Sequence, residues 1–159
     1  MISAAGMVKS RQHGFTYLIA LMVVATTGIA ATVSYTSYKI NAAKQMEAEL
    51  LFRGLAYYKA IESFYYAKEP KKYPRRMDDL LKDPRYLTTH RHIRRLYLVA
   101  NGDEWKIIYD AKGGIIGVYW DNAEKPIKRA NFNKVFQHFE NAKSYSDWKF
   151  IFQEQRPSL

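Results

Sequence analysis

The stretch that decides the fold of this chain runs from residue 9 to residue 39 and reads KSRQHGFTYLIALMVVATTGIAATVSYTSYK. Its uncharged part, from Phe15 to Tyr38, is 24 residues long and contains no Asp, Glu, Lys or Arg. As a helix it would span roughly 36 Å, which exceeds the roughly 30 Å hydrocarbon core of a bilayer. The apolar core of an ordinary secretory signal has only about 7–15 residues. The segment therefore predicts a single-pass membrane anchor.

The helical pattern continues beyond the anchor. Apolar residues recur at spacings of three, four and seven: Met46, Leu50, Leu51, Leu55, Tyr58, Ile61 and Tyr65. Glu49 and Arg53 have the i,i+4 spacing of an ion pair on another face of the same helix. The first proline of the chain is Pro70. We therefore expect one helix from Phe15 to about Lys68, with residues 15–38 in the membrane and an amphipathic half at 39–68.

The rest of the chain, residues 69–159, is expected to form a small globular head. Asn101-Gly102 and Lys112-Gly113-Gly114 are hairpin signals. The expected elements are, in order, a short helix around 77–82, a three-stranded meander within 96–120, a helix within 131–142 and a last strand within 147–152. The sequence thus predicts an α+β fold, in which a long N-terminal helix packs on a small antiparallel sheet.

Two sets of residues are candidates for the core of this head. Trp105, Ile107 and Tyr109 alternate along a predicted strand and should share one face of the sheet. Four further residues have helical spacing in the later segment: Phe132, Val135, Phe136 and Phe139. The head therefore has enough aromatic and aliphatic side chains to pack against the second half of the long helix.

The composition excludes some kinds of chemistry. The chain has no cysteine, which excludes disulfides, thiol catalysis and cysteine-ligated metals. Its 25 basic and 15 acidic residues give a net charge of +10. Only two of the basic residues, Lys9 and Arg11, precede Phe15, so a chain that began at Phe15 would still carry +8. The basic character belongs to the globular part of the chain.

No pattern of catalytic or cofactor-binding residues stands out. His90-Arg91-His92 could hold a metal, but the surrounding arginines disfavour a cation. Asp121, Asn122 and Glu124 could donate oxygens to calcium, yet their spacing forms no recognisable site. We find neither a glycine-rich phosphate loop nor a Ser/His/Asp arrangement. We therefore predict no catalytic residue, no metal site and no cofactor, and the protein is not expected to be an enzyme.

A cluster of basic residues is the main feature outside the anchor. It comprises Lys71, Lys72, Arg75, Arg76, Arg91, Arg94 and Arg95, with Arg85 between its two halves. One interpretation is a solvated face without a partner. The other is a surface that contacts an acidic protein, lipid head groups or nucleic acid. Tyr73, Tyr86 and Tyr97 lie among these charges, as they would in a single-strand nucleic-acid binder, although nucleic acid is the less expected partner.

The residues before the anchor form a short basic leader that ends at a glycine. Lys9 and Arg11 are followed by Gly14, and Phe15-Thr16 begins the apolar helix. This junction resembles the processing signal of type IV pilins and of the pseudopilins of type II secretion. The resemblance implies that a prepilin peptidase cuts between Gly14 and Phe15 and then methylates the new amino group of Phe15. Residues 1–14 would then be a prepilin leader.

The resemblance extends over most of the chain. EAELLFRGLAYYKAIESFY in the helix, PRRMDDLLKDPRY after it and SYSDWKF near the end are similar to pseudopilin-like proteins of type II secretion loci. It implies a single pass through the bacterial inner membrane, a cytoplasmic N-terminus and a periplasmic head. The implied partners are membrane lipid, the prepilin peptidase, the inner-membrane assembly platform and other pseudopilins, which would pack through the N-terminal helix.

One position departs from the pattern of the family. The family usually carries a glutamate at the fifth position after cleavage, where this chain has Ile19. In the family that carboxylate neutralises the N-terminal amine of a neighbouring subunit. Ile19 therefore favours a minor subunit of a periplasmic pseudopilus that helps to export folded proteins. The alternatives are a minor pilin of a type IV pilus or DNA-uptake filament, and an anchored binding protein that does not assemble.

Overall fold

The computed structural model describes residues 13–154, except for the side chains of residues 13–14 and 27–36. The chain divides into two units, Met1–Asn41 and Ala42–Leu159. The elements are the helices α1 (His13–Tyr66) and α2 (Asp78–Leu81), the strands β1 (Lys106–Tyr109), β2 (Ile115–Tyr119) and β3 (Phe150–Ile151), and the 3₁₀ helices η1 (Lys134–Asn141) and η2 (Tyr145–Asp147). This is an α+β arrangement with one small antiparallel sheet, as the sequence predicts.

Helix α1 confirms the prediction of one long helix. It begins two residues before Phe15 and ends two residues before Lys68. Among the residues that the structure describes, no helix is both long and apolar enough to cross a membrane. The predicted anchor at 15–38 includes residues 27–36, whose side chains lie outside the described residues, and most of the predicted leader also lies outside them.

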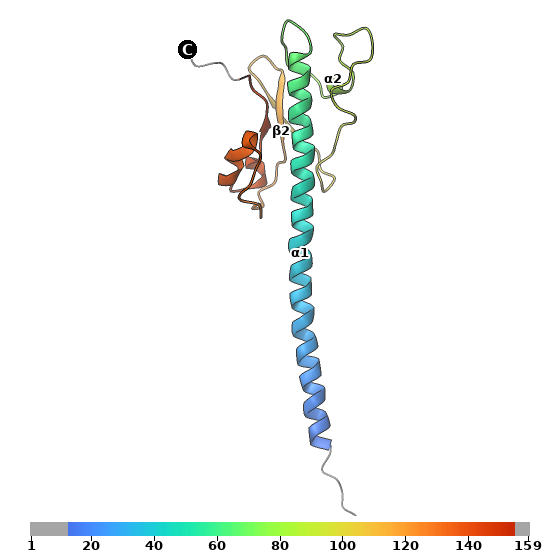
Figure 1. Ribbon diagram of the computed structural model, residues 1–159, viewed down its shortest axis with the longest axis vertical. Helices are drawn as coiled ribbons and strands as arrows, with labels where there is room; N and C mark the ends of the chain where they lie inside the picture. The colour runs from blue at the N-terminus through green and yellow to red at the C-terminus, as the bar shows by residue number, and fades with distance from the viewer. Residues whose placement is uncertain (1–12, 155–159) are drawn as a thin grey trace, which may run out of the picture. The chain divides into compact units, whose positions relative to one another are not determined.

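Within the second unit, α1 is packed on two sides. Figure 1 shows the sheet and the 3₁₀ helices on one side of α1 and the segment that carries α2 on the other. The predicted stripe is confirmed, since Leu50 and Ile61 are fully buried and its other members pack partly buried against them. A second row, which the stripe does not include, is buried as well: Tyr57, Ala60 and Phe64. Two buried rows on one helix explain how so small a sheet can support a core.

The sheet is a three-stranded antiparallel one with the order β1-β2-β3. Its middle strand, β2, is buried along most of its length, and its partners are both short edge strands. Gly117 in β2 lies opposite Ile151 in β3. A Cβ at Gly117 would collide with the backbone of Phe150, so the close pairing of β2 and β3 requires a glycine there.

The prediction of a three-stranded meander within 96–120 is wrong in its first strand. Residues 96–99 form no strand, and the third strand of the sheet comes from the C-terminal end of the chain. The reason is that side chains of α1 bind the backbone of this segment. The hydroxyl of Tyr57 donates to the carbonyl of Tyr97 and accepts from its N–H, at 2.9 and 2.8 Å. Arg53 donates to the carbonyls of Leu98 and Val99.

The predicted alternation of Trp105, Ile107 and Tyr109 is only partly correct. Trp105 is buried and Ile107 packs against the core, but Tyr109 is 54% exposed. The register of β1 against β2 shifts between Ile108 and Tyr109, where Tyr109 pairs with Ile115. A bulge of this kind reorients the residues that follow it, because the side-chain period of a strand is two.

Aromatic side chains fill the core beside the sheet. The predicted helix within 131–142 is present as η1, in 3₁₀ form, and it contributes Phe136 and Phe139. The ring of Phe139 stacks on Trp148 with centroids 5.6 Å apart and meets the edge of Phe150 at 5.2 Å. Phe150 is fully buried and belongs to β3, so the predicted last strand is confirmed as a short strand.

Candidate functional site

The residues of the predicted processing site are only partly described. The backbone of Gly14 belongs to α1, and its neighbour Phe15 is 69% exposed. Ile19, at the fifth position of the expected mature chain, is 45% exposed. Lys9 and Arg11 lie outside the described residues. The chemistry at this junction therefore stays a prediction.

Members of the predicted basic cluster lie against different elements of the second unit. Lys71 bonds to Glu154 at 2.9 Å and lies 5.0 Å from the ring centre of Tyr66, close to the end of β3. Arg91 belongs to a segment that is hydrogen-bonded to α2, because the N–H groups of residues 92 and 93 donate to the carbonyl of Leu80. Figure 1 places these two regions on different sides of α1. Arg75 and Arg76 lie at α2 as well, since their backbone N–H groups donate to Asp79 at 3.0 Å. Whether the cluster binds a partner stays a prediction.

A buried ionic group ties this α2 segment together. The side chain of Asp83 is fully buried. Arg85 donates hydrogen bonds from Nε and Nη2 to its two carboxylate oxygens, and the shortest of them is 2.7 Å. Arg85 also donates to the carbonyl of Phe64 in α1 and stacks on that ring. Burial raises the pKa of Asp83, but the hydrogen bonds from Arg85 and His92 outweigh burial and lower the pKa to about 2.

His92 extends this group toward α1. Its side chain is fully buried, with Nε2 3.2 Å from Asp83 and Nδ1 2.8 Å from the hydroxyl of Ser63. Burial lowers the pKa of His92, against the opposing effect of Asp83. The neutral ring then donates from Nε2 to the carboxylate, while Nδ1 accepts from Ser63. The sequence did not reveal this series, because Ser63 is 29 residues from His92.

Ser63, His92 and Asp83 have the hydrogen-bond order of a nucleophile, a base and its orienting acid. Two features argue for a structural role. The carboxylate is already held by Arg85, and neither the cavity of about 330 Å³ nor the groove of about 590 Å³ described below is lined by these residues. Within the described part of the chain, the group connects α2 to α1.

The buried group predicts that the head becomes less stable in acid. The unfolded chain takes up a proton at His92 near pH 6.5 and at Asp83 near pH 3.8, whereas the folded pKa values are lower. The stabilisation that these two groups contribute is therefore fully present above about pH 6.5. It decreases as the pH falls below the unfolded pKa of His92, and again below that of Asp83. Urea unfolding followed by tryptophan fluorescence should give a lower midpoint at pH 5 than at pH 7.5.

The matched variant for this prediction is His92→Gln, which cannot take up a proton. It should lose part of the decrease between pH 7.5 and pH 5 while keeping the decrease below pH 4, which belongs to Asp83. A wild-type midpoint that stays constant or rises between pH 7.5 and pH 5 would contradict the assignment of a buried neutral His92.

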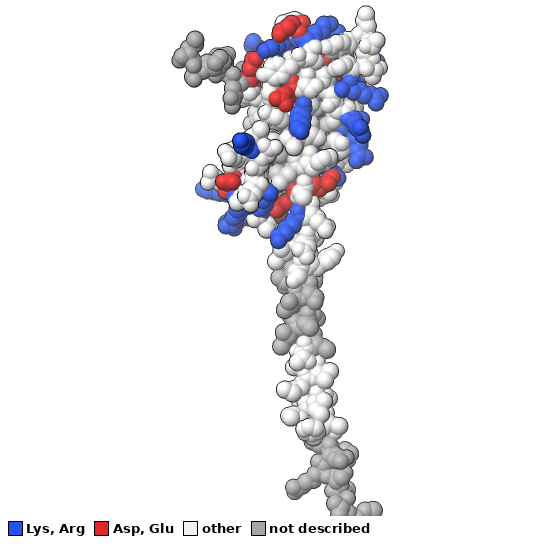
Figure 2. All heavy atoms as spheres, viewed as in Figure 1, with Lys and Arg blue, Asp and Glu red and all other residues white. Residues whose placement is uncertain are grey.

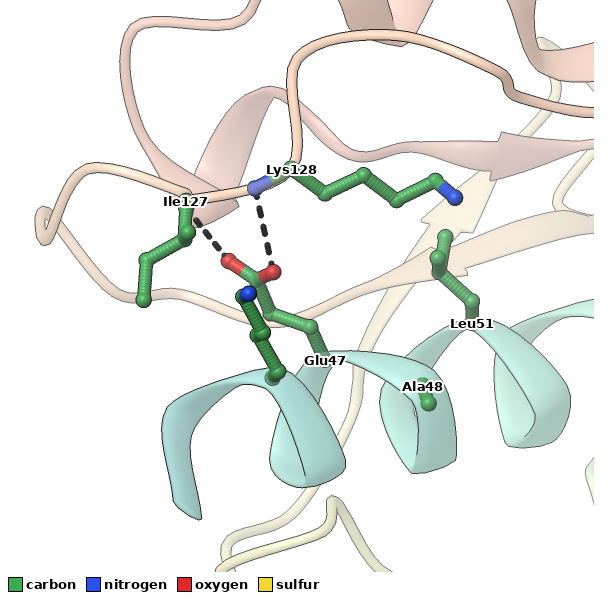
Figure 3. A pocket seen from close by; sticks show the side chains of 6 residues that line it. Glu47, Ala48, Leu51, Ile127 and Lys128 are labelled. Carbon is green, nitrogen blue, oxygen red and sulfur yellow. Dashed lines mark hydrogen bonds between the residues drawn. The ribbon is translucent and has the colours of Figure 1, made fainter. Parts of the chain in front are cut away.

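A second buried carboxylate, Glu47, fastens the loop before η1 to α1. Its oxygens accept from the backbone N–H groups of Ile127 and Lys128 at 2.5 and 3.1 Å, and from the hydroxyl of Tyr145 at 2.9 Å. Figure 3 shows the two backbone bonds from the loop to the carboxylate above α1. Burial and the bond to Glu47 both raise the pKa of Tyr145. Glu47 is the first acidic residue of the whole chain.

A cavity of about 330 Å³ opens beside this carboxylate. Its walls are the aliphatic side chains of Ala48, Leu51 and Ile127, and its lining includes the ammonium-bearing side chains of Lys44 and Lys128. Figure 3 shows the Lys128 side chain extending toward Leu51. Glu47 already accepts three hydrogen bonds, which hold the loop before η1 and Tyr145 against α1. The cavity can receive a small apolar group and offers no acid–base pair.

The groove of about 590 Å³ lies over the sheet and is lined by residues of β1, β2 and β3. Its polar end includes Asp121, whose carboxylate accepts from Ser146 at 3.4 Å. Of the other residues considered for calcium, Asn122 accepts from the backbone N–H of Glu124 through its amide oxygen at 2.7 Å. The backbone carbonyls of Asn122 and Glu124 accept from residues of η2. The described residues contain no group of three or more His, Cys, Asp or Glu side chains able to hold a metal ion.

Comparison of the chain with protein-family models, with curated proteins and with solved structures found no match.

Proposed function

We propose that this chain is a pilin-like subunit, specifically a minor pseudopilin of a type II secretion system. The observation that carries the proposal is the junction of Gly14 and Phe15, followed by 24 uncharged residues. Helix α1 runs without a break from before this junction to Tyr66, and its second half enters the core of an α+β head. The prepilin peptidase would release residues 1–14 and methylate the amine of Phe15.

The proposed place of the protein is the bacterial inner membrane. Residues 15–38 would cross the bilayer once, with the N-terminus in the cytoplasm and the head in the periplasm. In a bilayer the backbone of a helix satisfies its own polar groups, which supports a helical form for this uncharged segment. The assembled pseudopilus would help to move folded proteins through the outer membrane.

The charge distribution supports a minor position in the filament. No acidic residue precedes Glu47, and Glu47 is bound within its own head. A copy of this chain therefore offers no carboxylate in its first 46 residues to the Phe15 amine of another copy. A filament of this subunit alone would leave every such amine unpaired in the membrane, which is unfavourable. Mixed assembly, with another subunit supplying the acid, avoids this cost.

Ile19→Glu tests this place in the assembly. At a minor position the new carboxylate finds no amine, and an unpaired charge inside the bilayer costs about 2.5–3.5 kcal/mol. We expect the variant to leave secretion unchanged or to reduce it. In a shaft subunit the carboxylate would meet a neighbouring amine, so an increase in secretion would contradict a minor position. The measurement is secretion by cells that carry the variant as their only copy.

Crosslinking provides a second readout of the same question. The chain has no cysteine, so one introduced at the exposed Ile40 is its only thiol. We expect disulfide crosslinks mainly to other minor subunits that carry a matching cysteine. Abundant crosslinks between copies of this chain along sheared filaments would contradict a minor position.

A further inference from the structure

The segment of residues 84–98 carries four arginines and no acidic residue. Arg85 forms an ion pair with Asp83, whereas Arg91, Arg94 and Arg95 are exposed. In Figure 2, Lys and Arg side chains gather along the right-hand edge of the second unit, the side on which Figure 1 places α2. The segment forms no helix or strand, and it is held by α2 and α1 instead.

Arg91, Arg94 and Arg95 differ from three other arginines of the second unit in having no acidic partner within the described part of the chain. Arg53, Arg76 and Arg85 each form an ion pair with a carboxylate. Among the described residues, no carboxylate lies within ion-pair distance of Arg91, Arg94 or Arg95. Their guanidinium groups therefore remain available to carboxylates of another molecule, which they can bind through two hydrogen bonds each.

Apolar side chains lie in the same region. Leu98 is 53% exposed, and Phe52 of α1 is 59% exposed while its ring meets that of Tyr97 at 6.5 Å. Arg95 lies over the ring of Tyr97 at 5.1 Å. We define the arginine face by its exposed members: Phe52, Arg91, Arg94, Arg95, Leu96 and Leu98. Arginine and aromatic residues are enriched at the centres of protein interfaces.

We propose that the arginine face binds an acidic protein chain. Carboxylates of the partner would pair with the guanidinium groups, and its apolar side chains would cover Leu98 and Phe52. Arginine suits this role because its guanidinium is weakly hydrated and planar, so it tolerates an interface better than an ammonium group. Glu49 of α1 is already paired with Arg53, whose guanidinium also binds the carbonyl of Leu98.

The state of the aromatic rings favours protein over nucleic acid. A single strand binds by stacking its bases on free aromatic faces. The ring of Tyr97 is contacted by Arg95, Phe52 and Tyr57, and that of Tyr86 is stacked by His90 at 4.7 Å.

The test uses the full chain in neutral detergent micelles and fluorescence anisotropy at 0.15 M salt. The probe is a labelled 12-residue peptide of alternating Asp and Leu, and a second peptide of alternating Asp and Ser carries the same charge. Unlabelled oligo(dT) of 12 nucleotides and a short-chain phosphatidylglycerol serve as competitors. We expect the Asp-Leu peptide to bind more tightly than the Asp-Ser peptide, and neither competitor to displace it at equal concentration.

Arg94→Glu/Arg95→Glu should weaken binding of the Asp-Leu peptide about tenfold or more. The matched control is Lys106→Glu/Lys112→Glu, which makes the same charge change on exposed residues of the sheet side and should weaken binding less than about twofold. Leu98→Ser keeps all charges and should weaken only the Asp-Leu peptide. Absent binding, equal losses in the two double variants, or displacement by oligo(dT) or the phospholipid would each overturn the proposal.

Discussion

Gly54→Ala is expected to destabilise the head by about 2 kcal/mol or more, although alanine is the better helix former. In an exposed helix the same change would stabilise by about 1 kcal/mol. Here a Cβ on Gly54 would collide with three atoms of the Phe150 ring, closer than real Cβ atoms approach. That ring is fully buried, its residue pairs with Val118 in β2, and Phe136 and Phe139 contact it.

Whether Gly54→Ala raises or lowers the stability of the head shows which effect is larger at this position, helix propensity or packing. All three tryptophans are buried in the second unit, so tryptophan fluorescence of the full chain in micelles reports unfolding of the head. The midpoint temperature should fall by on the order of 10 °C. Gly54→Ala/Phe150→Leu should recover part of the loss, because leucine leaves room for the methyl group. A midpoint that rises in Gly54→Ala would contradict the close contact of α1 with β3.

Asp83→Asn is expected to have an effect of similar or greater size. It keeps the shape of the side chain but removes the charge that compensates the partly buried Arg85. Breaking a buried ion pair by removing one partner costs about 3–5 kcal/mol. We expect the lower end, because the Arg85 side chain keeps 18% of its exposure. The loss should be measured by urea unfolding of the full chain at pH 7.5.

The matched control for Asp83→Asn is Asp78→Asn. It removes the same charge from a carboxylate that pairs with Arg76 at 3.4 Å, with both side chains more than half exposed. An exposed pair of this kind contributes little, so the control should unfold at the wild-type urea concentration. If both variants lose the same stability, the effect comes from net charge and the buried group has no special role.

The long helix could be predicted because its signal is local. A run without charges or proline, followed by a stripe with helical spacing, defines α1 to within two residues at each end. The same spacing also connects Tyr57, Ala60 and Phe64, so their burial could have been predicted. It was missed because one apolar row usually marks the only buried face of a helix.

The third strand could not be predicted from local pattern. Residues 96–99 are apolar and are followed by a turn, which fits a strand, but Arg53 and Tyr57 bind their backbone groups from 40 to 46 residues away. The strand that completes the sheet, β3, contributes only two residues. Side chains far away in the sequence therefore decided where the sheet ended.

The buried ionic group was missed for a similar reason. From the sequence, Arg85 was assigned to the basic cluster, and His92 was considered only as part of a possible His90-Arg91-His92 metal site. The signal in the sequence was Asp83, a single acidic residue in a basic segment. If such a carboxylate is buried, it needs a cationic partner. Only the fold brings Ser63 and Phe64 of α1 to this group. The charged residues of this one segment therefore have two roles: some form the buried ionic group, and the others form the exposed arginine face.

The most direct test of the account is the intact mass of the native protein, extracted from membranes of cells that contain a prepilin peptidase. We expect a chain that begins at Phe15, with one methyl group on its amine and residues 1–14 removed. Gly14→Val should retain the whole leader, because a branched side chain at that position should block the cut that we propose. A native protein that still carries residues 1–14 would contradict the proposed processing and, with it, the pilin-like function.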